Sequence, residues 1–93
     1  MPAVLIVDDE SSIRSYFRKL FKKNGFIVFE AANGGSGLQC LKKETVNLII
    51  LDLKIPEMNG AEFLTELRSE KIKISVILIT GYSESHLIQD AMQ

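Results

Sequence analysis

Three of the four aspartates in this 93-residue sequence directly follow apolar segments of strand length. Asp8 and Asp9 come after the run Ala3–Val7, and Asp52 comes after the run Val46–Leu51. Carboxylates that are brought together repel one another, and a bound Mg²⁺ ion, which prefers a few carboxylates and keeps several waters, removes that repulsion. If the two segments are neighbouring strands, the three acids predict a Mg²⁺ site with room for a phosphoryl oxygen. The alternative is that these acids only end strands or cap the next helix.

A hydroxyl and a glycine end another apolar run, Ile74–Thr80, which is followed by Gly81. Thr80 could donate a hydrogen bond to an oxyanion held at Asp52, and Gly81 would let backbone N–H groups approach that anion. Taken alone, Thr80 is more simply a β-branched residue that finishes a strand. Together with the acids, it indicates an anion site.

Strand-length apolar runs alternate with amphipathic segments along the whole chain. Four strand–helix units of this kind, with strands that are nearly continuously apolar, predict an α/β fold in which a doubly wound parallel sheet lies between helices. In the order 2-1-3-4-5, the first and third strands are neighbours, and the ligand site lies at the carboxyl ends of the strands. We expect strands at 3–7, 26–29, 46–51 and 74–80, and helices that begin at 11 or 12, after 33–35, at 59 or 60, and after 81.

Helical spacing predicts which side chains of the helices are buried. In the first helix one apolar face should pack on the sheet; it consists of Ile13, Tyr16, Phe17, Leu20 and Phe21. The third helix should bury Phe63, Leu64 and Leu67 before it ends at Ser69. Glu30, directly after the second strand, indicates that this strand lies near a sheet edge.

The composition excludes several classes of protein. Eleven basic residues against 12 acidic residues give a net charge of −1, which argues against nucleic-acid binding by this segment, and 46% hydrophobic residues are typical of one soluble globular domain. A single cysteine, Cys40, excludes an internal disulfide and fits the cytoplasm. The apolar runs are too short for a membrane helix, and the acids at Asp8 leave no room for the apolar core of a signal peptide.

Three motifs in combination resemble the receiver domain of bacterial two-component response regulators. They are the acids of Val7–Glu10, the segment Leu51–Gly60 with its proline and glycine, and Ile79–Gly81. The resemblance runs from Ala3 to the last residue. It implies a flavodoxin-like receiver fold with strand order 2-1-3-4. The fifth strand and fifth helix of the family have no counterpart in this sequence, so we expect residues 1–93 to form a single receiver domain that is incomplete at its C-terminal end.

The resemblance also implies a role for each site residue. Asp52 is the expected phosphoacceptor, and Thr80 is the switch hydroxyl that reorients toward the phosphoryl group. Asp9 and Asp52 are expected to bind Mg²⁺ through their side chains, Asp8 mainly through a bound water, and Lys54 through its backbone carbonyl. The expected partners are a sensor histidine kinase or a phosphotransfer protein, and a downstream output domain.

One family feature cannot be carried over, because the lysine that ends the fifth strand has no position here. We therefore expect slower phosphorylation and weaker coupling of phosphorylation to shape. Without a fifth strand, the segment Ile74–Thr80 would be a long, apolar sheet edge. We expect self-association, through pairing of that edge or through exchange of the expected fourth helix and its neighbours between chains. The alternative is that the fourth helix rearranges and folds back over the exposed sheet face.

Three functions remain open on the sequence. The leading one is signalling by phosphorylation of Asp52, with no enzymatic activity beyond phosphorylation and dephosphorylation of the chain itself. The second is a metal-dependent phosphatase of the aspartyl-phosphate type; such enzymes carry an acid two residues after the nucleophile, where this sequence has Lys54. The third is a receiver-like interaction module that is not phosphorylated. The joint presence of Asp8, Asp9, Asp52 and Thr80 disfavours it.

Overall fold

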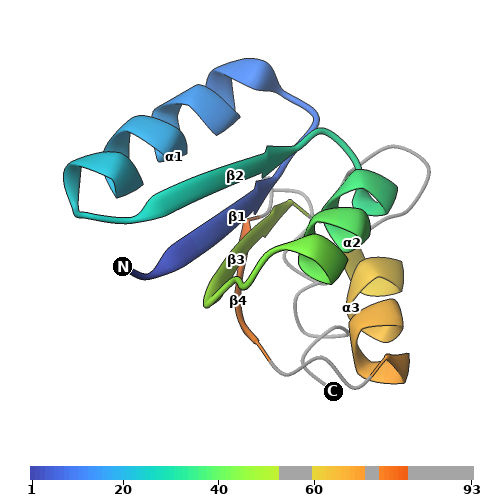
Figure 1. Ribbon diagram of the computed structural model, residues 1–93. Helices are drawn as coiled ribbons and strands as arrows, with labels where there is room; N and C mark the ends of the chain where they lie inside the picture. Colours follow the sequence, from blue (N-terminus) through green and yellow to red (C-terminus); the bar gives the residue numbers. More distant parts are fainter. Residues whose placement is uncertain (53–59, 71–73, 80–93) are drawn as a thin grey trace.

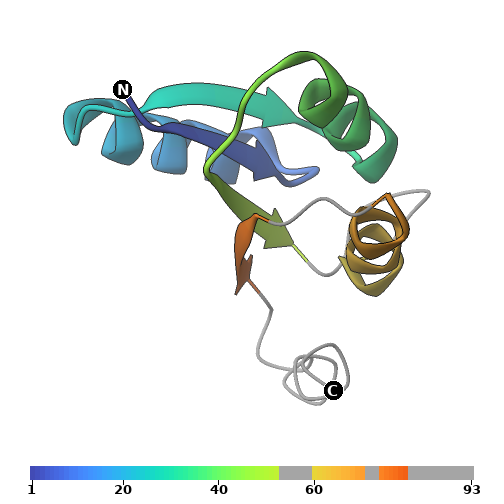
Figure 2. The ribbon, with the colours of Figure 1, turned by 60° about the horizontal axis from the view of Figure 1, so that its bottom comes forward.

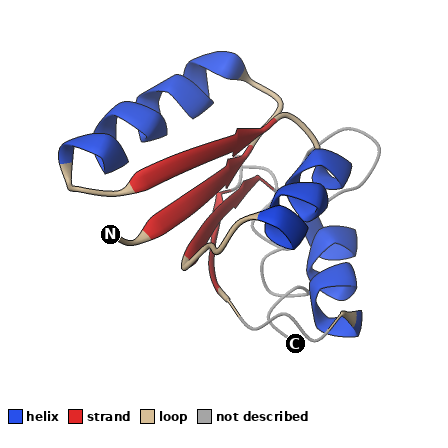
Figure 3. Ribbon diagram, viewed as in Figure 1, coloured by secondary structure: helices blue, strands red, loops and turns tan. Residues whose placement is uncertain are grey.

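The computed structural model describes residues 1–52, 60–70 and 74–79 and contains a parallel sheet with helices on both faces (Figures 1 and 3). The strands follow the order β2-β1-β3-β4, as predicted. Along the chain the elements are β1 (Ala3–Val7), α1 (Ser11–Lys23), β2 (Ile27–Ala31), α2 (Gly34–Lys43), β3 (Leu48–Asp52), α3 (Gly60–Ser69) and β4 (Ser75–Ile79).

Strand β1 is the centre of the fold, and all five of its residues are buried. Because successive side chains of a strand point to opposite faces, the strand supplies two separate cores. Leu5 and Val7 pack in a cluster with Phe63 and Leu67 of α3, whereas Val4 and Ile6 pack toward Phe17 and Phe21 of α1. The continuous apolar run therefore reflects burial on both faces, as expected for a parallel sheet.

The helices are divided between the two faces of the sheet. Helix α1 covers one face, and α2 and α3 lie together on the other, where Lys42 of α2 pairs with Glu70 just after α3 at 3.5 Å (Figure 2). Several element boundaries differ from the sequence prediction by one or two residues. Strands β2 and β3 each begin and end later than predicted, β4 begins one residue later, and α2 already begins at Gly34, within the predicted turn 33–35. The prediction that β2 lies at a sheet edge is confirmed.

The predicted buried face of α1 is wrong at two positions. Tyr16 is 63% exposed and Leu20 is 42% exposed, whereas Phe17 and Phe21 contact the sheet core. Helical spacing predicts a wide apolar stripe, but the sheet covers only the part centred on the two phenylalanines. Tyr16 and Leu20 flank that part and border an open groove on the surface of α1.

Strand β4 pairs with β3 and with no other strand in the described part of the chain. Ile77 on β4 is 51% exposed. The expected fourth helix, in residues 81–93, lies outside the described residues. Within those residues, no helix has the length and apolar character needed to cross a membrane.

Helix α2 approaches the sheet closely because it carries glycine where it crosses β1. A Cβ atom on Gly37 would lie 3.1 Å from Phe63 Cε2 and 3.2 Å from Val7 Cγ2, which is tighter than ordinary packing. At Gly35 the nearest atom, Asn33 Oδ1, would be 3.5 Å away, an ordinary contact. The two glycines therefore differ in what they contribute to packing, although they lie in the same helix.

We predict opposite effects of substitution at these glycines. Gly37→Val should lower the free energy of unfolding by about 1–3 kcal/mol, because its side chain must displace Phe63 or Val7. The control Gly35→Ala should raise it by up to about 1 kcal/mol, because alanine favours the helix and meets no obstacle. Urea unfolding followed by circular dichroism measures both. Equal stability of the two variants would contradict the close approach at Gly37.

Candidate functional site

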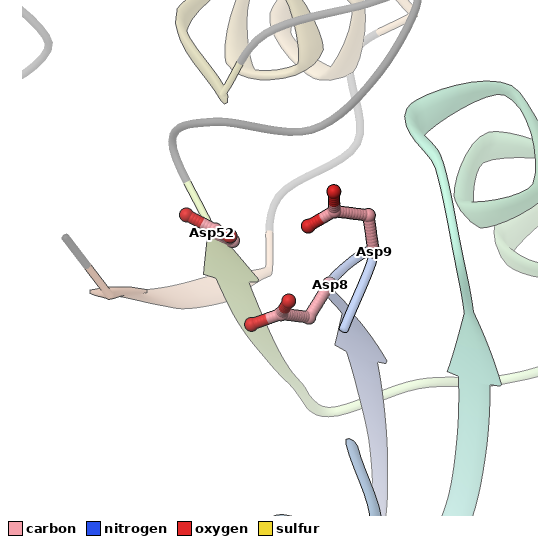
Figure 4. A group of neighbouring side chains, drawn as sticks. All are labelled: Asp8, Asp9 and Asp52. Atoms are coloured by element: carbon pink, nitrogen blue, oxygen red, sulfur yellow. The ribbon is translucent and has the colours of Figure 1, made fainter. Parts of the chain in front are cut away.

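Three carboxylates converge at the carboxyl ends of β1 and β3 (Figure 4). Asp52 is the last residue of β3, and the parallel register pairs Val7 with Leu51, which places Asp8 and Asp9 beside it. One carboxylate oxygen from each of the three residues lies within 4.8 Å of the others. The structure thus brings three of the predicted site residues together. The other two, Thr80 and Lys54, lie outside the described residues.

The three acids differ in how far they are exposed to solvent. Asp8 is buried, with 1% of its surface exposed, Asp52 is half-buried, and Asp9 is exposed. This gradient follows from the chain path, since Asp8 continues the buried strand β1 while Asp9 is the first residue to leave it. The site therefore has one buried carboxylate and two that solvent or a ligand can reach.

The buried carboxylate of Asp8 is only partly satisfied by the protein. Its Oδ1 accepts a hydrogen bond of 2.9 Å from the backbone N–H of Glu10. Its Oδ2 is buried and has no hydrogen-bond partner among the residues that the structure describes. A buried, unpartnered carboxylate oxygen is costly, and such atoms in native structures often indicate an absent water or ion.

Burial raises the pKa of Asp8 above its ordinary value. The hydrogen bond from the Glu10 N–H opposes this rise in the pKa, and so does the charge of Arg14, whereas the negative charges of Asp9 and Glu10 add to it. The direction of the pKa shift shows that the ionised form of Asp8 is disfavoured in the protein alone. A cation at the site would reverse that preference.

The arrangement fits a hard divalent cation. Among the described residues the buried Oδ2 of Asp8 has no hydrogen-bond partner, and oxygens of Asp9 and Asp52 lie close enough to share one ion with Asp8. An all-carboxylate donor set suits Mg²⁺, which also keeps several waters. The described residues can therefore supply a metal site, and the two positive charges of the ion would reduce the repulsion among the three carboxylates.

Two residues beside the site were missed by the sequence analysis. Arg14 Nη1 donates a hydrogen bond of 2.6 Å to the backbone carbonyl of Asp8, and Arg14 Nε lies 3.4 Å from Glu30 Oε1. No spacing rule links Arg14, one turn into a helix, to Glu30 on a neighbouring strand. The one available signal was a charged residue at the end of β2, which the sequence analysis interpreted only as the mark of a sheet edge.

We predict that Asp8→Asn stabilises the metal-free protein. Because the folded-state pKa of Asp8 is raised, the native state holds its proton where the unfolded state has lost it. The free energy of unfolding of wild type should therefore fall as the pH rises from the unfolded pKa through the folded pKa, and stay lower above it. Asp8→Asn should lack this decline and be more stable at neutral pH.

Urea unfolding in the presence of a chelator, over a series of pH values, checks this prediction. The two free-energy profiles should meet at low pH and separate as the pH rises. Parallel profiles for wild type and Asp8→Asn would contradict the assigned cost of the buried carboxylate.

The sequence is similar to other bacterial proteins over nearly its whole length. Sporulation initiation phosphotransferase F of Bacillus subtilis is 40% identical over 90 residues, which cover 97% of this chain and 73% of that protein. A putative transcriptional regulator of Pseudomonas aeruginosa is 39% identical over 94 residues. The alignment covers 100% of this chain but 45% of the regulator, so some relatives are more than twice as long as the matched region.

The fold is likewise similar to solved structures. The response regulator receiver domain protein from Clostridium thermocellum superposes with a TM-score of 0.90 at 26% identity, covering 99% of this chain and 75% of that one. The response regulator protein TrrA from Thermotoga maritima, solved in complex with Mg²⁺-BeF, gives 0.87 at 33% identity, covering 97% and 76%. Residues 4–93 also match the family described as the response regulator receiver domain, and the chain therefore belongs to that family.

Proposed function

We propose that this chain accepts a phosphoryl group on Asp52 from a phosphohistidine of a histidine kinase or a phosphotransfer protein. The observation that carries the proposal is the convergence of Asp8, Asp9 and Asp52 within 4.8 Å at the ends of adjacent strands. In the step proposed, a carboxylate oxygen of Asp52 attacks the phosphorus atom and forms the new P–O bond. The P–N bond breaks, and the imidazole nitrogen leaves with the bonding electrons and then takes up a proton.

The geometry favours Asp52 over its two neighbours as the nucleophile. Asp8 is buried and one of its oxygens is bonded to the Glu10 N–H, so an incoming phosphohistidine cannot reach it. Asp9 lies beyond the end of β1, outside the sheet. Asp52 is half-buried and still within β3, where its register partner on β4 is Ile79. A nucleophile on a paired strand is held in place, which suits a reaction that depends mainly on positioning.

The two other acids are proposed to hold a Mg²⁺ ion together with Asp52. When bound, the ion would stabilise the negative charge that develops on the phosphoryl oxygens during the transfer. By holding this ion, Asp8 and Asp9 would lower the negative charge of a surface that would otherwise repel a phosphoryl donor. We further propose that the backbone carbonyl of Lys54 is a metal ligand. The hydroxyl of Thr80 is proposed to donate a hydrogen bond to the phosphoryl group.

The relatives support this reading of the site. One is named a phosphotransferase, and one was solved with Mg²⁺-BeF. The partners proposed for this chain are a histidine kinase or phosphotransfer protein, an output domain, and a second copy bound through the β4 edge, all in the cytoplasm. A receiver-like module that is never phosphorylated is the alternative that the next experiment separates.

We predict that acetyl phosphate with Mg²⁺ adds one phosphoryl group to the wild-type chain and none to Asp52→Asn, because the amide is not nucleophilic. Mass spectrometry of the intact protein measures the adduct, and hydroxylamine should remove it as expected for an acyl phosphate. The matched control is Asp90→Asn, which changes the one aspartate outside the cluster and should be phosphorylated like wild type. An adduct that persists in Asp52→Asn would overturn the assignment, and no adduct on wild type would favour the interaction module.

We also predict that Mg²⁺ stabilises the folded chain. Binding to the native state alone raises the free energy of unfolding by about 1.4 kcal/mol at a concentration about ten times Kd. Asp9→Ala should abolish this increase, and should stabilise the metal-free protein slightly by removing a like charge. Thermal melts with Mg²⁺ or chelator measure both effects, with Glu44→Ala, which removes an exposed acid at the end of α2, as the control. Melts of wild type that ignore millimolar Mg²⁺ would exclude the metal site.

A further inference from the structure

The backbone of Asp8 is held by hydrogen bonds at both its N–H and its carbonyl, the first to β2 and the second from α1. Its N–H donates a hydrogen bond of 3.0 Å to the carbonyl of Ala31, the last residue of β2. Its carbonyl accepts a hydrogen bond of 2.6 Å from Arg14 Nη1, and a guanidinium donor makes this bond stronger than a neutral one. The peptide group between Asp8 and Asp9 is therefore fixed by a side chain from α1.

Arg14 is itself held in a network of partly buried charges. Its Nε lies 3.4 Å from one carboxylate oxygen of Glu30, whose other oxygen accepts a 3.0 Å hydrogen bond from Arg18 Nη1. Arg18 also donates to the hydroxyl of Ser15 at 3.2 Å. The side chain of Arg14 is 18% exposed and that of Glu30 is 29% exposed, so the contact is better sheltered from solvent than an ordinary surface ion pair.

We propose that Arg14 is a positioning residue, which fixes the Asp8–Asp9 peptide so that both carboxylates face Asp52 in an arrangement ready to bind a divalent cation. This inference rests on the Mg²⁺ site of the proposed function. The Asp8 carbonyl belongs to the peptide that joins the two acids, so its orientation sets the direction in which each side chain leaves the strand. Mutation of groups that do not touch the metal but orient its ligands typically lowers metal affinity by about 10- to 100-fold.

The positioning role and simple electrostatics predict opposite results. Arg14 carries a positive charge beside Asp8 and lowers the negative potential that attracts a cation. If charge alone mattered, its removal would strengthen Mg²⁺ binding. If Arg14 positions the acids, its removal weakens Mg²⁺ binding, because the freed peptide must be reordered each time the ion binds.

The experiment is a Mg²⁺ titration of the wild-type chain and three variants, followed by calorimetry, with folding checked by circular dichroism in chelator. Arg14→Met removes both the charge and the bond to the Asp8 carbonyl. Arg18→Met is the matched control, since Arg18 lies one turn further along α1 and shares the partner Glu30, but in the described part of the chain it makes no hydrogen bond or ion pair with Asp8. If Arg14→Met does not fold, Arg14→Gln replaces it in the experiment, because glutamine keeps a polar group at this half-buried position.

We expect Arg14→Met to bind Mg²⁺ about tenfold more weakly than wild type, while Arg18→Met stays close to wild type. Binding by Arg14→Met, or by Arg14→Gln in its place, that equals or exceeds wild type would overturn the positioning role. An equal loss in Arg18→Met would also overturn it, because the Asp8 carbonyl would then not be the point of action. Failure of the wild-type chain to bind Mg²⁺ would overturn the proposed metal site and this inference together. This outcome differs from failure of the positioning role alone, in which wild type binds Mg²⁺ and the variants do not differ as expected.

Discussion

Three carboxylates gathered at one edge of a parallel sheet repel one another, and the fold has to hold them together against that repulsion. Asp8, Asp9 and Asp52 offer oxygens within 4.8 Å of one another, and Asp8 is almost completely buried. Water screens charges poorly where a carboxylate is buried. The repulsion among the three acids therefore favours protonation of an acid, binding of a cation, or unfolding of the chain. The fold must therefore hold the acids in place with stability that comes from elsewhere.

That stability comes from the two cores on either side of β1. Every residue of β1 is buried, and the strand is paired with β2 on one side and β3 on the other, so its end cannot withdraw when the acids repel. On the face of α2 and α3, Gly37 brings the helix within contact distance of Val7, the residue just before Asp8. On the other face, α1 supplies Arg14 to the carbonyl of Asp8. The site is thus fixed from both faces of the sheet and from both neighbouring strands.

The sequence allowed accurate prediction of the strand that is buried on both faces of the sheet. Strand β1 was predicted residue for residue, because a short, largely β-branched apolar run that ends at two acids favours a buried strand that reaches a polar edge. Phe63 and Leu67 were correctly predicted to be buried. Tyr16 and Leu20 were not, because periodicity shows which side of a helix is apolar but not how much of that side a neighbour covers.

The candidate site shows the same division. The meeting of Asp8, Asp9 and Asp52 could be predicted because strand ends are readable from sequence and a parallel sheet collects them at one edge. The strand order that makes β1 and β3 neighbours came from the resemblance to receiver domains rather than from the residues. The contact of Arg14 with the Asp8 carbonyl could not be predicted, since a backbone acceptor leaves no signature in the sequence.

The gradient of exposure across the three acids suits the cation binding and phosphoryl transfer that we propose for them. A fully exposed cluster would bind a cation weakly, because water competes for every oxygen, whereas a fully buried one would exclude the phosphoryl donor. Here Asp8 is buried at the end of β1, Asp52 is half-buried at the end of β3, and Asp9 is exposed beyond the sheet. In the proposed metal site, the buried oxygen of Asp8 would favour a bound cation, and the more open oxygens of its neighbours would leave that cation accessible. Any change that equalised the exposure of the three acids would weaken either the attraction for the ion or the access of the donor.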